Sequence, residues 1–306
     1  MIICPSCSAE LPGSLACNYC SWQAKYRAGL PVFLKDSDLD DPVTRSYLEN
    51  YDEIAKDDLD GKVMDERYIE NLSTNLCNII DLPPEAEVCD IGSGKGFLVR
   101  KLKARGAGNV TAVDISLPYL ARMVGEPGIS PVLANAESLP FLDHFDVVVA
   151  TDVLEHVLNV GSLLYSANRA LRTNGRLYIR VPYKENLLPY SPHFGCPSRF
   201  VHLRTYDRPL LRQALTEAGF AVERVWYDGY VPELRRALWR GGRLRRMTYA
   251  GFEWWLNSTG RDFNSATLRP HGLSPIFLRP TVVVAAARKV GRLVPLAGRG
   301  FQLEAA

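Results

Sequence analysis

The stretch from Glu87 to Leu98 constrains the fold more than any other part of this 306-residue chain. It reads Glu-Val-Cys-Asp-Ile-Gly-Ser-Gly-Lys-Gly-Phe-Leu: an apolar run, three glycines within five residues, and then the start of a helical pattern. Glycine allows positive φ and lets a ligand lie against the backbone, while the first N–H groups of the following helix face that ligand. The pattern therefore predicts the strand–turn–helix opening of a nucleotide-binding βαβ unit.

An acidic residue follows at the spacing that such a unit requires. The next apolar run, 109–114, ends in Asp114, about twenty residues after the glycines, where a carboxylate can accept both hydroxyls of a ribose. Lys95 would suit a phosphate, but the turn matches neither Gly-x-x-x-x-Gly-Lys-Ser/Thr nor a clean Gly-x-Gly-x-x-Gly. A P-loop or dinucleotide enzyme is therefore the weaker interpretation, and we expect Lys95 to be an exposed residue at a helix start.

Two further stretches complete a family resemblance. Residues 135–141 read Asn-Ala-Glu-Ser-Leu-Pro-Phe, and residues 145–157 read Phe-Asp-Val-Val-Val-Ala-Thr-Asp-Val-Leu-Glu-His-Val. With the glycine turn and Asp114, they resemble four motifs of the class I S-adenosylmethionine-dependent methyltransferases, in the branch of the ubiquinone-pathway O-methyltransferases. The resemblance covers about residues 47–289. It implies an α/β fold with a Rossmann-like seven-stranded sheet and helices on both faces, and S-adenosylmethionine as the cofactor.

The resemblance also implies which residues contact the cofactor. Asp90 would accept from the cofactor's ammonium group, and Asp114 from the ribose. Asn135 would meet the adenine amino group, and the N–H of Ala136 a ring nitrogen. The complete set is Asp90, Gly92, Ser93, Gly94, Gly96, Asp114, Ile115, Asn135, Ala136, Glu137, Thr151 and Asp152.

Histidines are the candidate general bases. Methyl transfer requires alignment of the acceptor, exclusion of water and, for some acceptors, removal of one proton, for which histidine is best suited near neutral pH. His156 follows the expected fourth strand, whereas His193 and His202 lie in a loop rich in His, Arg and aromatic residues. In some relatives an acidic cluster at this turn is proposed to hold a divalent metal. Asp152, Glu155 and His156 could hold Mg²⁺ in that way, but we favour a structural role for His156.

Four cysteines near the N-terminus predict a metal site. Cys4 and Cys7 form one Cys-x-x-Cys pair, and Cys17 and Cys20 form another. Four thiolates suit tetrahedral Zn²⁺, and a closed four-cysteine shell is structural rather than catalytic. A redox dithiol or two chance pairs are the alternatives. The segment is similar to small zinc ribbons that precede methyltransferase domains, some of which act on ribosomal RNA.

The chain divides into four parts by composition and pattern. We expect a zinc-ribbon module over residues 1–34, a helical cap over 35–84, a methyltransferase domain over 85–290 and a C-terminal tail over 291–306. Within the cap, an apolar stripe predicts a helix around residues 47–54, and a second helix should run from Met64 to Ile80 before a Pro-Pro pair.

An insertion at about 228–275 carries unusual charge. The segment Arg235–Arg246 contains six arginines and no acid, with Trp239 among them. Such a segment suits a membrane surface, a phosphorylated carrier or RNA, with a solvated helical face as the plain alternative. We prefer a carrier-linked or membrane-proximal contact over RNA. The seven cysteines, and an N-terminus without the pattern of a secretory signal, predict a cytoplasmic location, with peripheral attachment to the inner face of the membrane as an option.

These observations predict an S-adenosylmethionine-dependent methyltransferase. Its acceptor should be an oxygen of a small molecule or glycan, of the secondary-metabolite or surface-polysaccharide type. One alternative is an RNA methyltransferase that uses the zinc ribbon and the arginine-rich insertion. Another is a non-catalytic subunit that binds S-adenosylmethionine for a partner. Nothing in the sequence indicates the oligomeric state.

Overall fold

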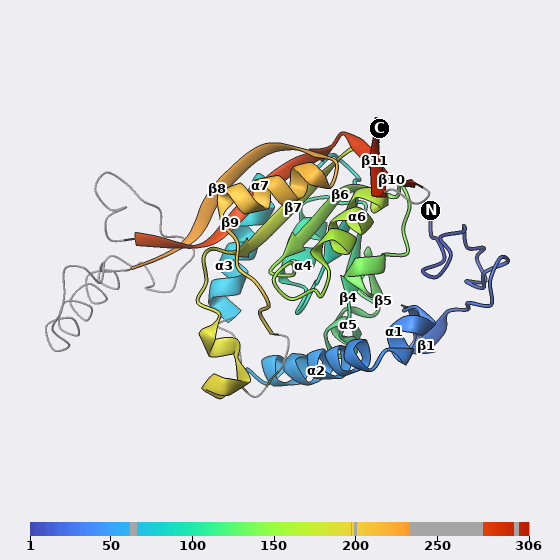
Figure 1. The fold of residues 1–306 in the computed structure, drawn as a ribbon, viewed down its shortest axis with the longest axis horizontal. Helices are drawn as coiled ribbons and strands as arrows, with labels where there is room; N and C mark the ends of the chain where they lie inside the picture. Colours follow the sequence, from blue (N-terminus) through green and yellow to red (C-terminus); the bar gives the residue numbers. More distant parts are fainter. Residues whose placement is uncertain (62–65, 197, 199–200, 233–277, 297–299, 306) are drawn as a thin grey trace, which may run out of the picture.

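A nine-stranded sheet with helices on both faces forms the body of the protein (Figure 1). The computed structural model describes residues 1–61, 66–196, 198, 201–232, 278–296 and 300–305. The sheet strands are β1 (Lys25–Arg27), β2 (Leu30–Phe33), β3 (Glu87–Ile91), β4 (Asn109–Asp114), β5 (Ile129–Ala134), β6 (Phe145–Thr151), β7 (Leu171–Pro182), β8 (Phe220–Pro232) and β9 (Leu278–Lys289).

The strand order is β1-β2-β5-β4-β3-β6-β7-β9-β8. Strands β5, β4, β3, β6 and β7 are parallel to one another, and β9 pairs antiparallel with both β7 and β8. The last seven strands of this order are the predicted methyltransferase sheet, which confirms the fold class. The order reverses at β3, from which the chain runs out to β4 and β5 and then returns to β6. Ligands of open α/β sheets bind at such a switch point, beyond the carboxyl ends of the strands.

Helices cover the two faces of the sheet because each face carries apolar side chains. The helices are α1 (Asp36–Asp40), α2 (Pro42–Leu59), α3 (Glu66–Ile79), α4 (Phe97–Ala104), α5 (Leu117–Leu120), α6 (Val160–Ala170) and α7 (Arg208–Glu217). Buried leucines of α3, α4 and α5 form one core with one face of the sheet. Buried leucines of α6 and α7 form the core on the opposite face. Both faces are therefore closed to water, as parallel sheets require.

The first two strands come from the predicted zinc-ribbon module. Strand β2 extends the sheet by pairing in parallel with β5, so that Val32 lies opposite Leu133. The backbone N–H of Ile3 also donates to the carbonyl of Pro140 at 2.9 Å. Inside the module, the Trp22 indole donates to the Leu34 carbonyl at 2.9 Å. Segment 1–34 is thus joined to the methyltransferase sheet by main-chain hydrogen bonds.

The helical cap and the tail differ in detail from the sequence-based expectation. The stripe around residues 47–54 lies within α2, and the second cap helix is described as α3, with residues 62–65 outside the described part. The tail forms an antiparallel pair of strands, β10 (Gly291–Leu296) and β11 (Gly300–Ala305). The tail is too short to show the alternating apolar pattern from which these two strands could have been predicted.

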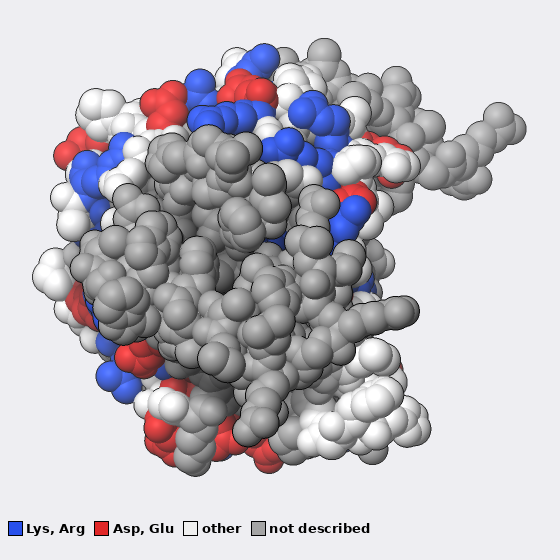
Figure 2. All heavy atoms as spheres, turned by 90° about the vertical axis from the view of Figure 1, so that its left-hand side faces the viewer, with Lys and Arg blue, Asp and Glu red and all other residues white. Residues whose placement is uncertain are grey.

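The arginine-rich segment Arg235–Arg246 lies outside the described residues, so its proposed contact stays a prediction. Figure 2 shows the face on the left-hand side of Figure 1, where described lysine and arginine side chains lie interspersed with acidic ones along the upper edge. None of the described helices is both long enough and apolar enough to cross a membrane.

Candidate functional site

A cavity of about 580 Å³ lies beyond the carboxyl ends of β3, β4, β6 and β7. Residues of α2, of α3 and of the loop after β7 also line it. Its volume is in the range of ligand pockets. Ten of the residues predicted to hold the cofactor line this cavity: Asp90, Gly92, Ser93, Gly94, Asp114, Ile115, Asn135, Ala136, Thr151 and Asp152.

The glycine turn is shaped by backbone geometry. Gly92 and Gly94 have φ values of +67° and +49°. A Cβ on Gly92 would lie 2.3 Å from Cγ2 of Val153, whereas a Cβ on Gly94 would meet nothing within 4 Å. Gly92 is therefore required by packing, and Gly94 leaves open space for a ligand. Gly96 does not line the cavity and instead begins α4 as its N-cap.

Asp114 faces this turn from the end of β4. Its Oδ2 accepts from the N–H of Gly94 and its Oδ1 from the N–H of Ser116, each at 2.9 Å. Burial raises the pKa of Asp114 to about 6, although the Ser116 and Gly94 N–H groups act in the opposite direction. Each carboxylate oxygen retains a second lone pair, so the side chain can also accept from the hydroxyls of a ribose.

Helix α2 is fastened over the glycine turn by polar contacts. The Lys95 ammonium contacts Asp58 Oδ1 at 3.1 Å and Glu66 Oε1 at 2.7 Å. With only 10% of its side chain exposed, Lys95 is not the exposed helix-start residue that we expected. Asp52 accepts from the Ser116 hydroxyl at 3.0 Å. Asp52 and Asp58 lie in a segment with many acidic residues, so the sequence could not predict which partner each of them has.

The predicted adenine loop is held by its own side chains. Asn135 Oδ1 accepts from the N–H of Glu137 at 2.9 Å. Glu137 Oε1 accepts from the N–H of Leu158 at 2.8 Å and of Asn159 at 3.1 Å, and Glu137 does not line the cavity. Glu137 therefore fastens this loop to the turn after β6, while Asn135 and Ala136 face the cavity.

Asp90 and Arg180 are buried charged groups on one face of the sheet. Asp90 is 1% exposed, and its Oδ1 has no hydrogen-bond partner. Burial raises the pKa of Asp90 to about 8, against the opposing effect of Arg180. Arg180 donates from Nε to Asp152 Oδ2 at 3.2 Å and also from Nη2 to this oxygen. Arg180 was not among the predicted residues, because an arginine in an apolar strand has no recognisable pattern.

His156 is tied to the cap and to the loop after β7. Its Nδ1 lies 2.8 Å from the Tyr51 hydroxyl and also contacts the Val201 carbonyl. Burial, followed by the neighbouring His202, lowers the pKa of His156 to about 4. A ring nitrogen engaged in this way favours the structural role of His156 over that of a base.

His202 lies against His156, with ring centroids 4.5 Å apart. Its Nδ1 contacts Glu185 Oε2, and its ring stacks on Tyr190 at a centroid distance of 4.1 Å. The Tyr190 hydroxyl donates to Glu185 Oε1 at 2.6 Å. Burial alone would raise the pKa of Glu185, but the hydrogen bonds from His202 and Tyr190 outweigh it and lower that pKa.

Glu185, Tyr190 and His202 all line the cavity, whereas His193 is exposed on a short turn outside it. Sequence reasoning did not identify Glu185 or Tyr190. The only available signal was their position in the same His-rich and aromatic loop.

Glu155, His156 and His202 form a second group of potential metal ligands. One ligand atom from each lies within 4.8 Å of the others. Both oxygens of Glu155 are buried without a hydrogen-bond partner, and burial raises the pKa of Glu155 well above its usual value. Asp152, which we had grouped with Glu155 and His156 for Mg²⁺, pairs with Arg180 instead. The donor set available at this turn is therefore one carboxylate and two imidazoles.

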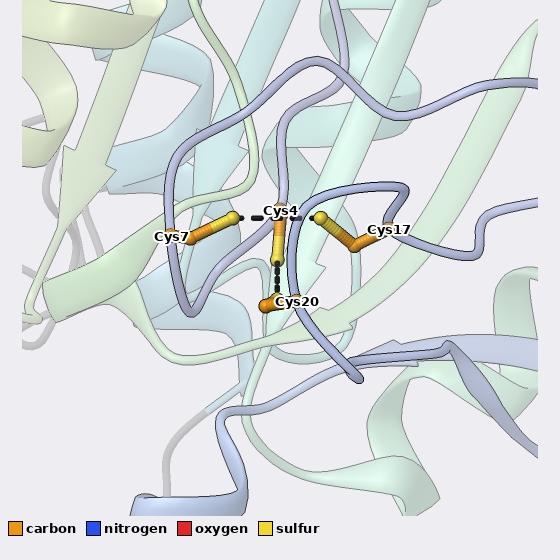
Figure 3. A group of neighbouring side chains, drawn as sticks. All are labelled: Cys4, Cys7, Cys17 and Cys20. Atoms are coloured by element: carbon orange, nitrogen blue, oxygen red, sulfur yellow. Dashed lines mark hydrogen bonds between the residues drawn. The ribbon is translucent and has the colours of Figure 1, made fainter.

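The four N-terminal cysteines converge at one point (Figure 3). The sulfur atoms of Cys4 and Cys20 are 3.6 Å apart, and those of Cys7 and Cys17 are 3.4 Å apart. Tetrahedral Zn²⁺ with bonds of about 2.3 Å requires sulfur–sulfur distances of roughly 3.8 Å. None of the four forms a disulfide. The cluster therefore fits Zn²⁺ in a closed shell.

The fold and the glycine-turn cavity are those of class I methyltransferases. The model of a family described as a methyltransferase domain matches residues 61–225, more than half of the 306 residues. The chain belongs to this family.

Two curated relatives are similar to parts of the chain. The biotin biosynthesis bifunctional protein BioHC of Cellvibrio japonicus is 30% identical over 164 residues, which are 52% of this chain and 31% of that protein. The mitochondrial ubiquinone biosynthesis O-methyltransferase of Schizosaccharomyces pombe is 33% identical over 101 residues, which are 30% of this chain and 36% of that protein. The chain thus spans about a third of the length of each.

A solved structure shares the fold. It is a chain from the complex of the Haloferax volcanii Trm112 methyltransferase activator with a protein described as a methyltransferase. The TM-score is 0.55 at 16% identity, and the likeness covers 78% of this chain and 96% of the other. At this identity, the likeness concerns the fold alone.

Proposed function

We propose that the protein transfers a methyl group from S-adenosylmethionine to an oxygen of a small molecule or glycan. The observation that carries the oxygen acceptor is the pair of His202 and Glu185 in the cavity that holds the predicted cofactor residues. A hydroxyl must lose its proton when it is methylated, and a histidine oriented by a carboxylate is suited to accept that proton.

The roles of the residues follow from their hydrogen bonds. Glu185 would accept the Nδ1 proton of His202 and so leave Nε2 free to take a proton from the acceptor hydroxyl. Tyr190 would hold Glu185 and the imidazole ring in place. S-adenosylmethionine would supply an electrophilic methyl group. The hydroxyl oxygen would form the new bond to this methyl carbon as the bond between sulfur and methyl breaks, which would release S-adenosylhomocysteine, while the hydroxyl proton passes to His202.

The cluster of Glu155, His156 and His202 supports a second possibility for the same reaction. A divalent ion at this cluster would lower the pKa of an acceptor hydroxyl as a Lewis acid. His202 would then be a ligand rather than a base. Methyl transfer that is stimulated by added Mg²⁺ and abolished by chelation would favour this arrangement. Activity that is insensitive to both favours His202 as the base.

The first test is the destination of the methyl group. The protein is incubated with methyl-tritiated S-adenosylmethionine and a fractionated lysate, and the label is followed into RNA, protein, lipid-linked and small-molecule pools. Label in the small-molecule or lipid-linked pool supports the proposal. Label in RNA would favour an RNA methyltransferase instead, and cofactor binding without label in any pool would favour a non-catalytic subunit.

The second test separates the two histidines of the loop after β7. With the acceptor pool identified, His202→Asn should lower kcat by about 10²–10⁴-fold, the usual effect of losing a general base. Glu185→Gln should lower it less, while cofactor affinity stays unchanged in both variants. If His193→Asn lowers kcat and His202→Asn does not, the assignment of His202 is wrong.

A further inference from the structure

A buried carboxyl group and a buried guanidinium group face the cavity without a full set of partners. Asp90 Oδ1 has no hydrogen-bond partner, and neither does Arg180 Nη1. Asp90 is 1% exposed and Arg180 is 2% exposed, so bulk water does not supply the missing hydrogen bonds. Buried polar atoms normally have partners, and an orphaned pair at a cavity wall indicates that a ligand supplies them.

The sheet places both side chains on the same face. Asp90 pairs with Val149, and Val149 pairs with Tyr178, two residues before Arg180 on β7. Because alternate residues of a strand face the same side, Asp90, Tyr178 and Arg180 share one face. A strand spacing of about 4.8 Å and a rise of about 3.3 Å per residue separate the Asp90 and Arg180 Cα atoms by roughly 12 Å. The long arginine side chain reduces the gap between the charged groups.

The other donors of Arg180 are already engaged. Its Nε and Nη2 both donate to Asp152, so the guanidinium is held in one orientation with Nη1 left over. A guanidinium held this way presents a fixed donor to an oxygen ligand. The ligand therefore needs a cationic group for Asp90 and an oxyanion for Arg180, a short distance apart.

We propose that Arg180 binds the carboxylate of the cofactor's methionine end while Asp90 binds its ammonium group. This inference rests on the proposed use of S-adenosylmethionine and adds a residue that the family motifs do not include. The other charges of the cavity support this ligand over an acidic acceptor. Asp114 and Asp152 also line the cavity, so a ligand with a net positive charge fits better than an anion.

The test compares two ligands that differ only in the carboxylate. Affinities of S-adenosylmethionine and its decarboxylated form are measured by calorimetry in the absence of any acceptor. The wild-type protein should prefer the carboxylated ligand by about 10- to 100-fold, the usual value of a charge-assisted hydrogen bond. In the double variant Arg180→Met/Asp152→Asn, which avoids leaving the Asp152 carboxylate without its ion-pair partner, this preference should disappear.

Two further variants keep the test decisive. Arg176→Met lies on the same strand, but its side chain pairs with Asp81 outside the cavity, so the ligand preference should persist. If the double variant does not fold, Arg180→Lys retains the charge with fewer donors and should show an intermediate preference. A preference that survives in the double variant, or stays at the wild-type value in Arg180→Lys, overturns the role of Arg180 but leaves the proposed function standing. If the wild-type protein binds neither ligand, both the inference and the proposed function fail.

Discussion

The backbone N–H of Gly94 donates to Oδ2 of Asp114 at 2.9 Å, which joins the glycine turn to the end of the neighbouring strand. The two residues are 20 positions apart in the chain. The carboxylate predicted to bind the ribose is therefore oriented by the loop predicted to lie beneath the rest of the cofactor.

Replacing Asp114 should weaken cofactor binding. Asp114→Ala removes the carboxylate predicted to accept from two ribose hydroxyls, at about 1.5–3 kcal/mol for each hydrogen bond to a charged group. Asp114→Asn keeps one side-chain oxygen and should lose less. Calorimetry with S-adenosylhomocysteine measures the difference, and unchanged affinity in both variants would show that Asp114 does not contact the ribose.

Cofactor affinity should also depend on pH through this side chain. Burial raises the pKa of Asp114 to about 6, so the carboxylate becomes protonated as the pH falls through this value. Affinity should therefore decrease between pH 7 and pH 5 in the wild-type protein. Asp114→Asn, which cannot titrate, serves as the control and should show a smaller decrease over the same range.

Substitution by alanine should reduce the free energy of unfolding more at Gly92 than at Gly94. At Gly92 a Cβ would both occupy a left-handed conformation and collide with Val153, so we expect a loss of about 2–5 kcal/mol in the free energy of unfolding. At Gly94 the cost should be only about 1–2 kcal/mol, because there is open space. Urea unfolding measures both, and equal losses would contradict the packing argument.

Gly94→Ala should instead reduce cofactor affinity, because Gly94 lines the cavity and its Cβ would occupy space that is open without a ligand. Calorimetry on the folded variant tests this. Unchanged affinity would indicate that no ligand lies against Gly94.

Ionisation of Asp90 should make the protein without cofactor less stable as the pH rises. Burial raises the pKa of Asp90 from 3.8 to about 8, so the contribution is fully present below about pH 4 and is lost as the pH rises through about 8. Asp90→Asn does not titrate. Its stability relative to the wild-type protein should therefore increase between pH 5 and pH 8, by at most about 1.4 kcal/mol for each pH unit. Urea unfolding without cofactor at both pH values tests this, and a constant difference would contradict it.

Metal removal should affect the edge of the sheet as well as the cysteine cluster. Chelation, or Cys17→Ser, should release the N-terminal segment and speed hydrogen exchange at β2 and at its partner β5, since Val32 and Leu133 lie opposite each other. Hydrogen exchange read by mass spectrometry measures this. Cys196→Ser, which alters a cysteine outside the cluster, is the control, and unchanged exchange at 129–134 after metal removal would show that the sheet edge is independent of the metal.

The sequence alone determined the elements whose information is local. Gly92, Gly94 and Gly96 marked the turn because only glycine takes these positive φ values without strain. Asp114 was identified by its place at a strand end, and the four cysteines by the spacing that a tetrahedral metal requires. The seven-stranded sheet was implied by the family resemblance that these motifs carry.

The tertiary structure decided which distant side chains meet. Arg180 reaches the cavity only because β7 lies beside β6, and Glu185 matters only because the chain folds back to bring His202 against it. His193 and His202 are nine residues apart in one loop, yet only His202 lines the cavity. Likewise, β2 joins the sheet through main-chain hydrogen bonds, which depend on backbone groups rather than on side-chain identity. Such pairings depend on packing between segments far apart in the chain, and local sequence patterns carry no record of them.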